Sequence, residues 1–108
     1  MKINEAIKAA IPVEKIYLFG SYAYGTPDKD SDFDFFIVLP DGGLKPLEAI
    51  RQARFAIIPL NRETPVDILA DYESRFEQRS KLNTLERKIL NDGMLLYERT
   101  KYYDRQAI

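Results

Sequence analysis

Two apolar runs, joined by a segment that begins with Gly-Ser and ends in aspartates, most constrain how this chain can fold. Lys15–Phe19 is apolar on both faces, which predicts a central strand covered on both sides. Gly20 ends this strand, and Ser21–Tyr24 is predicted to form a short helical turn. After a loop, Asp32–Leu39 is predicted to be the second strand. The polar segment therefore connects two strands of the predicted core.

Apolar spacing elsewhere predicts helices around these strands. Residues 3–11 repeat apolar side chains at helical spacing before Pro12. A helix over 44–58 is predicted from apolar-face positions three or four residues apart, which are Leu47, Ile50, Arg54 and Ile57. A third strand is predicted over 64–70, where Pro65 is tolerable only because it lies near the strand end.

The last third of the chain is predicted to add two helices and an edge strand. Residues 73–80 have helix-forming composition. Asn83 followed by Glu86 resembles a capping box opening a second helix, and Gly93 is placed to cap its end. The expected buried face of that helix comprises Leu82, Leu85 and Ile89. Residues 94–97 are predicted to form a short edge strand, and the last ten residues are either a partner-binding tail or a frayed end.

Length and composition limit the class of protein. With 108 residues, of which 45% are hydrophobic, we expect one domain over 1–108, an α/β (α+β) fold with a small mixed sheet flanked by helices. The net charge of -1 gives no global attraction to nucleic acid or anionic lipid. The chain has no cysteine and no histidine, which excludes disulfides, thiolate chemistry and histidine-based catalysis. No apolar run approaches the ~20 residues of a membrane span, so we expect a cytoplasmic protein.

Asp32 and Asp34 are candidate metal ligands. Alternate side chains of a strand share one face, so both carboxylates would lie side by side, roughly 6.5–7 Å apart along the strand. Two unpaired anions at this spacing repel each other, and a divalent cation relieves the conflict by sharing oxygens from both. Mg²⁺ prefers such hard oxygen ligands and leaves places for water and substrate phosphate. A solvent-facing strand end is the alternative reading of the pair.

Asp67 is the candidate for a third carboxylate. It lies between apolar neighbours on the predicted third strand, and a carboxylate on a half-buried strand needs a partner or a metal. If this strand pairs beside the second, Asp67 can face the same metal site, as a ligand in a two-metal arrangement or as the general base. Asp71 competes for this role but lies where a helix N-cap is expected.

Gly20 and Ser21 are candidate phosphate-binding residues. Glycine lets the backbone approach a phosphate without a clashing side chain. The serine hydroxyl and the amides of the turn can donate hydrogen bonds to phosphate oxygens. A simple tight turn with a serine cap is the alternative. The aspartate-rich loop from Asp28 to Asp30 is predicted to be a solvated turn.

The Gly-Ser pair, the ten-residue spacer, the Asp-x-Asp sequence and the later strand aspartate resemble the DNA polymerase β-type nucleotidyltransferase superfamily. The size and layout are similar to its minimal nucleotidyltransferases (MNT), over Ile16 to Tyr97. The resemblance implies a metal-dependent nucleotidyltransferase of that fold. Its site residues, for phosphate binding, metal binding and catalysis, would be Gly20, Ser21, Asp32, Asp34 and Asp67.

The resemblance also implies partners. Minimal members are typically encoded beside a helical HEPN protein, a ribonuclease toxin, and act as its antitoxin by transferring AMP from ATP to a toxin tyrosine. We therefore expect ATP as substrate, Mg²⁺ as cofactor and a hetero-oligomer with the toxin, without direct nucleic-acid binding. Tyr22 and Tyr24 depart from the family pattern, which often has arginines there, so positive charge near the triphosphate is missing.

Two rival functions remain at this stage. The chain could be a module that neutralises its partner by binding alone, with the aspartates only holding nucleotide. It could instead be an adenylyltransferase of a small molecule such as an aminoglycoside, although 108 residues leave little room for the added helical domain that such enzymes use. The basic side chains of the C-terminal helices are predicted to form a solvated face or to dock an acidic partner; they are Arg75, Arg79, Arg87 and Lys88.

Overall fold

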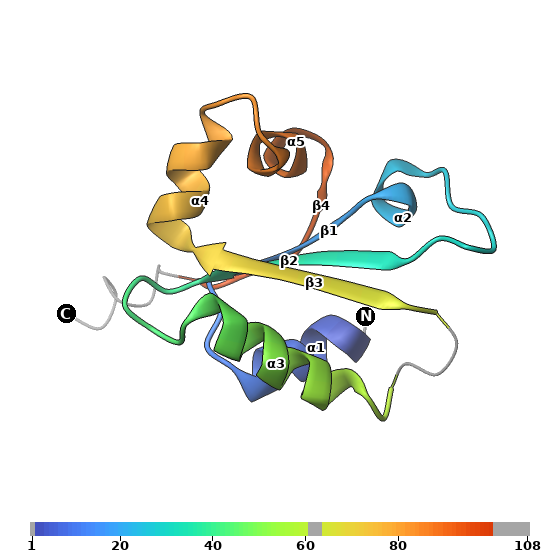
Figure 1. Cartoon of the computed structure of the whole chain (residues 1–108), viewed down its shortest axis with the longest axis horizontal. Helices are drawn as coiled ribbons and strands as arrows, with labels where there is room; N and C mark the ends of the chain where they lie inside the picture. The colour runs from blue at the N-terminus through green and yellow to red at the C-terminus, as the bar shows by residue number, and fades with distance from the viewer. Residues whose placement is uncertain (1, 61–63, 101–108) are drawn as a thin grey trace.

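A four-stranded mixed sheet lies between two layers of helices in the computed structural model, which describes residues 2–60 and 64–100 (Figure 1). The strands are β1 (Lys15–Phe19), β2 (Phe33–Leu39), β3 (Val66–Tyr72) and β4 (Met94–Glu98). Their spatial order is β3-β2-β1-β4. The predicted fold class, a small mixed sheet flanked by helices, is confirmed.

The pairing of the strands follows from their connections. β1 pairs antiparallel with β2 and with β4, so it is a central strand as its two apolar faces predict. β2 and β3 are parallel, which requires a crossover. The helix α3 (Pro46–Ile57) supplies that crossover and returns the chain to the same end of the sheet.

The helices α1 (Lys2–Ala10) and α3 cover one face of the sheet (Figure 1). The core there is built from inward residues of alternate strand positions, including the fully buried Ile16, Phe35 and Ile37. Ile7 of α1 is also fully buried against this layer. Burial of these large apolar side chains is the main contribution to folding on this side.

The opposite face carries α4 (Glu73–Ser80) and α5 (Leu85–Asp92). A second apolar cluster joins the helices to the sheet and comprises Tyr17, Phe36, Val38, Phe76 and Ile89. The ring of Phe76 stacks on Tyr17 with centroids 5.6 Å apart. The bounds of α4 agree with the prediction over 73–80.

The buried face of α3 differs from the prediction. Leu47 is 81% exposed and Arg54 is exposed too, whereas Ala49 and Ala53 are completely buried. Ile57 is buried as predicted. Small residues let the helix approach the sheet closely, so the contact face is set by alanines instead of the larger side chains. The helix also begins at Pro46, later than predicted, because proline suits the first helical position.

The start of α5 also differs. Its N-cap is Thr84, whose hydroxyl accepts a hydrogen bond from the backbone amide of Arg87, so the predicted cap at Asn83 was one residue too early. The inward face is formed by Glu86 and Ile89. The predicted inward residues Leu82 and Leu85 are exposed. The C-cap at Gly93 is confirmed.

Two strand boundaries differ from the predicted ones. β2 begins at Phe33, so Asp32 directly precedes the strand and does not belong to it. β3 runs to Tyr72 and therefore includes Asp71, which is not a helix N-cap as predicted. The side chain of Asp71 instead pairs with Arg75 one turn into α4.

The short turn helix α2 (Ser21–Tyr24), the edge position of β4 and the opening helix agree with the sequence analysis. Within the two described ranges, no helix has the length and apolar character needed to cross a membrane. The expectation for the C-terminal tail falls mostly on residues 101–108, which lie outside the described residues.

Candidate active site

Asp34 and Asp67 occupy paired positions on the parallel strands β2 and β3. Side chains of directly paired residues point to the same face of a sheet, so the two carboxylates share one face. Phe36 follows Asp34 on that face and packs under α4 and α5. The two aspartates therefore lie on the α4/α5 side of the sheet, near the first residues of both strands.

Gly20, directly after β1, lies against the carboxylate of Asp34. Phe19, the last residue of β1, pairs with Asp34. A Cβ built on Gly20 would overlap the Oδ2 atom of Asp34 and lie 3.1 Å from its Cγ. Gly20 also has a φ of +76° and a ψ of -161°, a conformation that is essentially restricted to glycine. Any side chain at this position would displace the carboxylate.

Ser21 is the first residue of α2, directly after this glycine. Among the described residues, no side chain caps the start of the helix. The first amides of a helix lack intrahelical acceptors, so an anion can accept hydrogen bonds from them. The amides of Ala23 and Tyr24 donate hydrogen bonds to the Gly20 carbonyl and so close this short turn. Gly20 and Ser21 are thus brought beside Asp34.

The electrostatics of the site converge on Asp34. Partial burial raises the pKa of its carboxyl above the ordinary value, and the nearby negative charges of Asp67 and then Asp32 raise the pKa further. Asp32 therefore contributes to the same field even though it precedes β2. The mutual repulsion of three carboxylates is the feature that a cation would relieve.

The donor set fits a Mg²⁺ ion of open coordination. Among residues 2–60 and 64–100, no three acidic or other ligating side chains are clustered closely enough to form a complete metal cage. Mg²⁺ does not need such a cage, because it usually keeps several waters and binds through one or two carboxylates together with substrate phosphates. The paired Asp34 and Asp67 have the oxygen chemistry for this mode.

Asp67 is solvent-exposed, which corrects one argument of the sequence analysis. β3 is an edge strand, and Asp67 on it is not half-buried as predicted. Water can solvate the carboxylate, which therefore needs neither an ion-pair partner nor a metal to offset burial. Its relation to Asp34 rests on the strand register and on the effect of its charge, which raises the pKa of the Asp34 carboxyl. Asp71, the competing carboxylate, pairs with Val38 further along the sheet and contacts Arg75.

The remaining predictions around the site have different outcomes. Tyr22 stacks on Phe33, with ring centroids 4.3 Å apart, and so acts as a packing residue. The side chain of Asp28 accepts a hydrogen bond from the amide of Asp30 in an exposed turn, as predicted.

The four basic residues of α4 and α5 are all solvent-exposed, as predicted, but three of them also contact other side chains. Arg75 and Arg79 of α4 pair with Asp71 and Glu86. Lys88 of α5 lies over the ring of Tyr24, with its ammonium 5.0 Å from the ring centroid. This contact was missed, because no local signal relates two residues so far apart in the chain.

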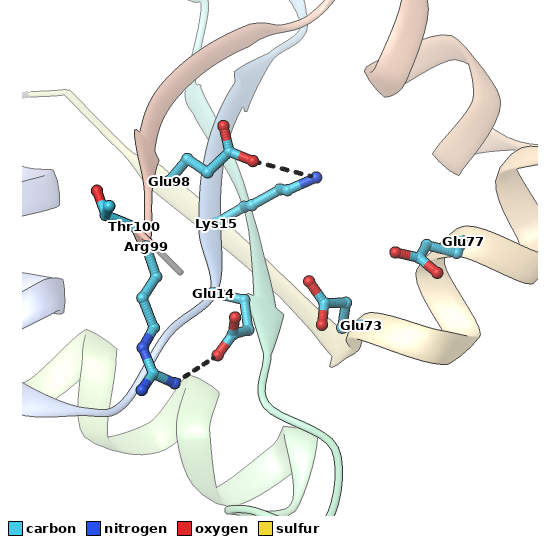
Figure 2. Close-up of a pocket in the computed structure, with 7 residues that line it drawn as sticks. All are labelled: Glu14, Lys15, Glu73, Glu77, Glu98, Arg99 and Thr100. Carbon is cyan, nitrogen blue, oxygen red and sulfur yellow. Dashed lines mark hydrogen bonds and ion pairs between the residues drawn. The ribbon is translucent and has the colours of Figure 1, made fainter. Parts of the chain in front are cut away.

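A cavity of about 490 Å³ lies elsewhere, at the opposite end of β1 from Gly20. Figure 2 shows its lining, with Glu14 paired to Arg99 and Lys15 paired to Glu98. The other lining residues are Glu73, Glu77 and Thr100. None of the candidate site residues lines this cavity.

The profile of the family described as nucleotidyltransferase domain matches residues 1–96. The chain belongs to the nucleotidyltransferase domain family. The matched range includes the Gly-Ser pair, the Asp-x-Asp sequence and β3. No curated protein matches the chain by sequence.

Solved structures resemble this nucleotidyltransferase domain. One is a toxin–antitoxin with AMP-PNP, at 24% identity and a TM-score of 0.60, with 97% of this chain and 77% of that chain covered. Another is a mutant of the toxin–antitoxin MntA–HpeT, at 25% identity and a TM-score of 0.60, with the same coverage. A protein from Sulfolobus solfataricus matches at 18% identity and a TM-score of 0.57, covering 93% of this chain and 78% of that chain.

Proposed function

We propose that this protein is a metal-dependent nucleotidyltransferase that transfers AMP from ATP to a tyrosine of a HEPN ribonuclease toxin and so acts as its antitoxin. The observation that carries the proposal is the paired position of Asp34 and Asp67, with Gly20 directly against the Asp34 carboxylate. Family membership supports the reaction class. The likeness to a solved toxin–antitoxin that contains AMP-PNP supports the choice of nucleotide and of partner class.

In the proposed reaction, Gly20 and Ser21 hold the triphosphate through the amides at the start of α2 and the serine hydroxyl. Asp32 and Asp34, with Asp67, would hold Mg²⁺, which when bound neutralises charge on the phosphate oxygens. The acceptor hydroxyl oxygen attacks the α-phosphorus and forms a P–O bond. The bond from the α-phosphorus to the bridging oxygen breaks, and pyrophosphate leaves. Asp67 takes the proton of the hydroxyl, and its exposure makes it accessible to an acceptor on another protein.

The exposed edge position of the site favours a large acceptor. Within residues 2–60 and 64–100, β3 has no further strand on its outer edge, and Asp67 is accessible from solvent. A protein tyrosine can reach such an open surface, whereas small-molecule acceptors are usually held in an enclosing pocket. This geometry supports the protein acceptor over an aminoglycoside.

The test is transfer of label from [α-³²P]ATP in the presence of Mg²⁺, with and without the product of the adjacent gene. The proposal expects label on the partner, lost in Asp34→Asn and retained in Asp30→Asn. Asp30 is a matched control, because it is an exposed aspartate of the preceding loop whose side chain makes no hydrogen bond or ion pair within the described chain. Label on neither protein with any of the four nucleoside triphosphates would contradict the proposal.

A binding module without catalysis is the second candidate. The observation that favours it is that Tyr22 and Tyr24 stand on α2, so this turn carries no cation of its own. In that case Asp34→Asn would still neutralise the toxin. Loss of neutralisation together with loss of label, in a variant that still binds the partner, distinguishes the enzyme from the module.

A further inference from the structure

Lys88 extends from α5 to the helix that begins at the glycine turn. Its ammonium lies 5.0 Å from the centroid of the Tyr24 ring, a cation–π contact between α5 and α2. Lys88 is exposed and makes no ion pair with a carboxylate of the described chain. The other contacting basic residues of these helices, Arg75 and Arg79, are already paired with carboxylates. Lys88 therefore has its charge available.

Direct contacts connect this cation to the carboxylates. Asp34 lies against Gly20, Gly20 caps α2, and the amide of Tyr24 donates to the Gly20 carbonyl. Lys88 then contacts Tyr24 from the side of α5. Ile89, the next residue of α5, is buried against the sheet face that carries Asp34. In Figure 1, α2 and α5 lie above the same side of the sheet.

The charge balance of the site favours a cation in this place. A triphosphate adds several negative charges to a surface where Asp32 and Asp67 already act on Asp34. In the proposed reaction a divalent metal would offset charge near the carboxylates, but the far phosphates would lie at the turn helix, where Tyr22 and Tyr24 contribute no positive charge. A flexible lysine stem with three donors can turn from an aromatic face to a phosphate oxygen.

We infer that Lys88 binds the β- and γ-phosphates of the nucleotide and supplies from α5 the positive charge that α2 lacks. The Tyr24 ring holds the ammonium near the turn before nucleotide arrives. The inference rests on the proposed function, because it assigns a further substrate-binding residue to the same site.

The test is equilibrium binding of an ATP analogue with a methylene group between the α- and β-phosphorus, measured by calorimetry with Mg²⁺ at fixed ionic strength. Loss of one charge-assisted hydrogen bond predicts that Lys88→Met weakens binding about tenfold to a hundredfold. Lys88→Arg keeps the charge and should restore most of the affinity. Arg87→Met is the matched control, because Arg87 is the exposed neighbour on α5 and its loss changes the net charge equally.

Each outcome decides the inference. Equal affinity of Lys88→Met and wild type would overturn it and leave the proposed function intact. Equal weakening by Lys88→Met and Lys88→Arg would mean that the lysine acts only through local packing, which also overturns it. Weakening by Arg87→Met to the same extent would indicate a general charge effect and would overturn it too. Failure of the wild type to bind the analogue would overturn both the inference and the proposed function.

Discussion

Gly20 lies so close to Asp34 that the carboxylate occupies the space a side chain at position 20 would need. The contact also combines with a φ of +76° that favours glycine. We expect Gly20→Ala to lower the free energy of unfolding by about 3 kcal/mol, from backbone strain and steric overlap together, and to abolish nucleotidyl transfer. Urea denaturation and the labelling assay measure the two effects.

Gly25→Ala provides the comparison for that experiment. Gly25 has a similar φ of +78°, but a Cβ there would meet nothing within 4 Å. We expect a loss of about 1–2 kcal/mol from the left-handed backbone alone, with activity retained. If both alanine variants lost the same stability and kept activity, the contact between Gly20 and Asp34 would have no functional meaning.

Asp34 should make the metal-free protein less stable as pH rises. The pKa of its carboxyl is raised in the folded state, so the folded protein binds more protons than the unfolded chain between the ordinary value of 3.8 and the raised value. Stability therefore falls as pH rises through this window. Asp34→Asn should remove that slope and raise the melting temperature at pH 7 in EDTA. Thermal melts from pH 3.5 to 7 measure it, and a lower melting temperature for the variant at pH 7 would contradict the repulsion.

Mg²⁺ should reverse this penalty. A ligand that binds only the folded state at ten times its Kd adds about 1.4 kcal/mol of stability. We expect Mg²⁺ to raise the melting temperature of the wild type and of Asp30→Asn, with little effect on Asp34→Asn or Asp67→Asn. Chelation should restore the initial value. An equal rise in all four proteins would place the metal elsewhere.

Arg79 should stabilise the connection between α4 and α5. Its Nε donates to Glu86 Oε2 at 2.8 Å, and Glu86 is buried with only 7% of its surface exposed. Arg79→Met leaves this carboxylate without its cation, so we expect a loss of about 2 kcal/mol. The double variant Arg79→Met/Glu86→Leu should recover most of it.

Arg75→Met is the control for this measurement, which uses chemical denaturation. Arg75 forms a more exposed pair with Asp71, and its loss should cost less than about 1 kcal/mol. Equal losses for Arg75→Met and Arg79→Met would mean that the burial of Glu86 has no energetic weight.

The hydroxyl of Tyr24 should be dispensable for stability. It is buried and has no hydrogen-bond partner in the described part of the chain. Tyr24→Phe keeps the ring under Lys88 and removes the unsatisfied group, so stability should stay constant or increase by up to about 1 kcal/mol. A clear decrease in melting temperature would show that the hydroxyl has a partner in solution.

The elements recognised from sequence are those whose signals are local. β1 was predicted because both of its faces are apolar, and its end was marked by Gly20. The face of α3 was mispredicted, because large apolar residues such as Leu47 suggest an inward face while the closest packing selects Ala49 and Ala53. Propensity describes side chains one by one, and packing distance is a property of the assembled layers.

The candidate site divides in the same way. The Gly-Ser turn and Asp34 are close in sequence, so their proximity follows from one strand-turn-strand segment. The pairing of Asp34 with Asp67 depends on which strand lies beside β2, so the sequence predicts it only on the condition that β3 pairs there. The contact of Lys88 with Tyr24 depends on how α5 crosses the sheet, for which a single sequence carries no signal.

The strand order has a consequence for biosynthesis. β1 is translated early, yet one of its two edges is paired only by β4, the last strand of the sheet. Until residues 94–98 leave the ribosome, the backbone donors and acceptors along that edge have no strand partner, and a second nascent copy could pair there. Completion of the C-terminal strand therefore covers the open edge of β1 and leaves β3 and β4 as the two edges of the finished sheet.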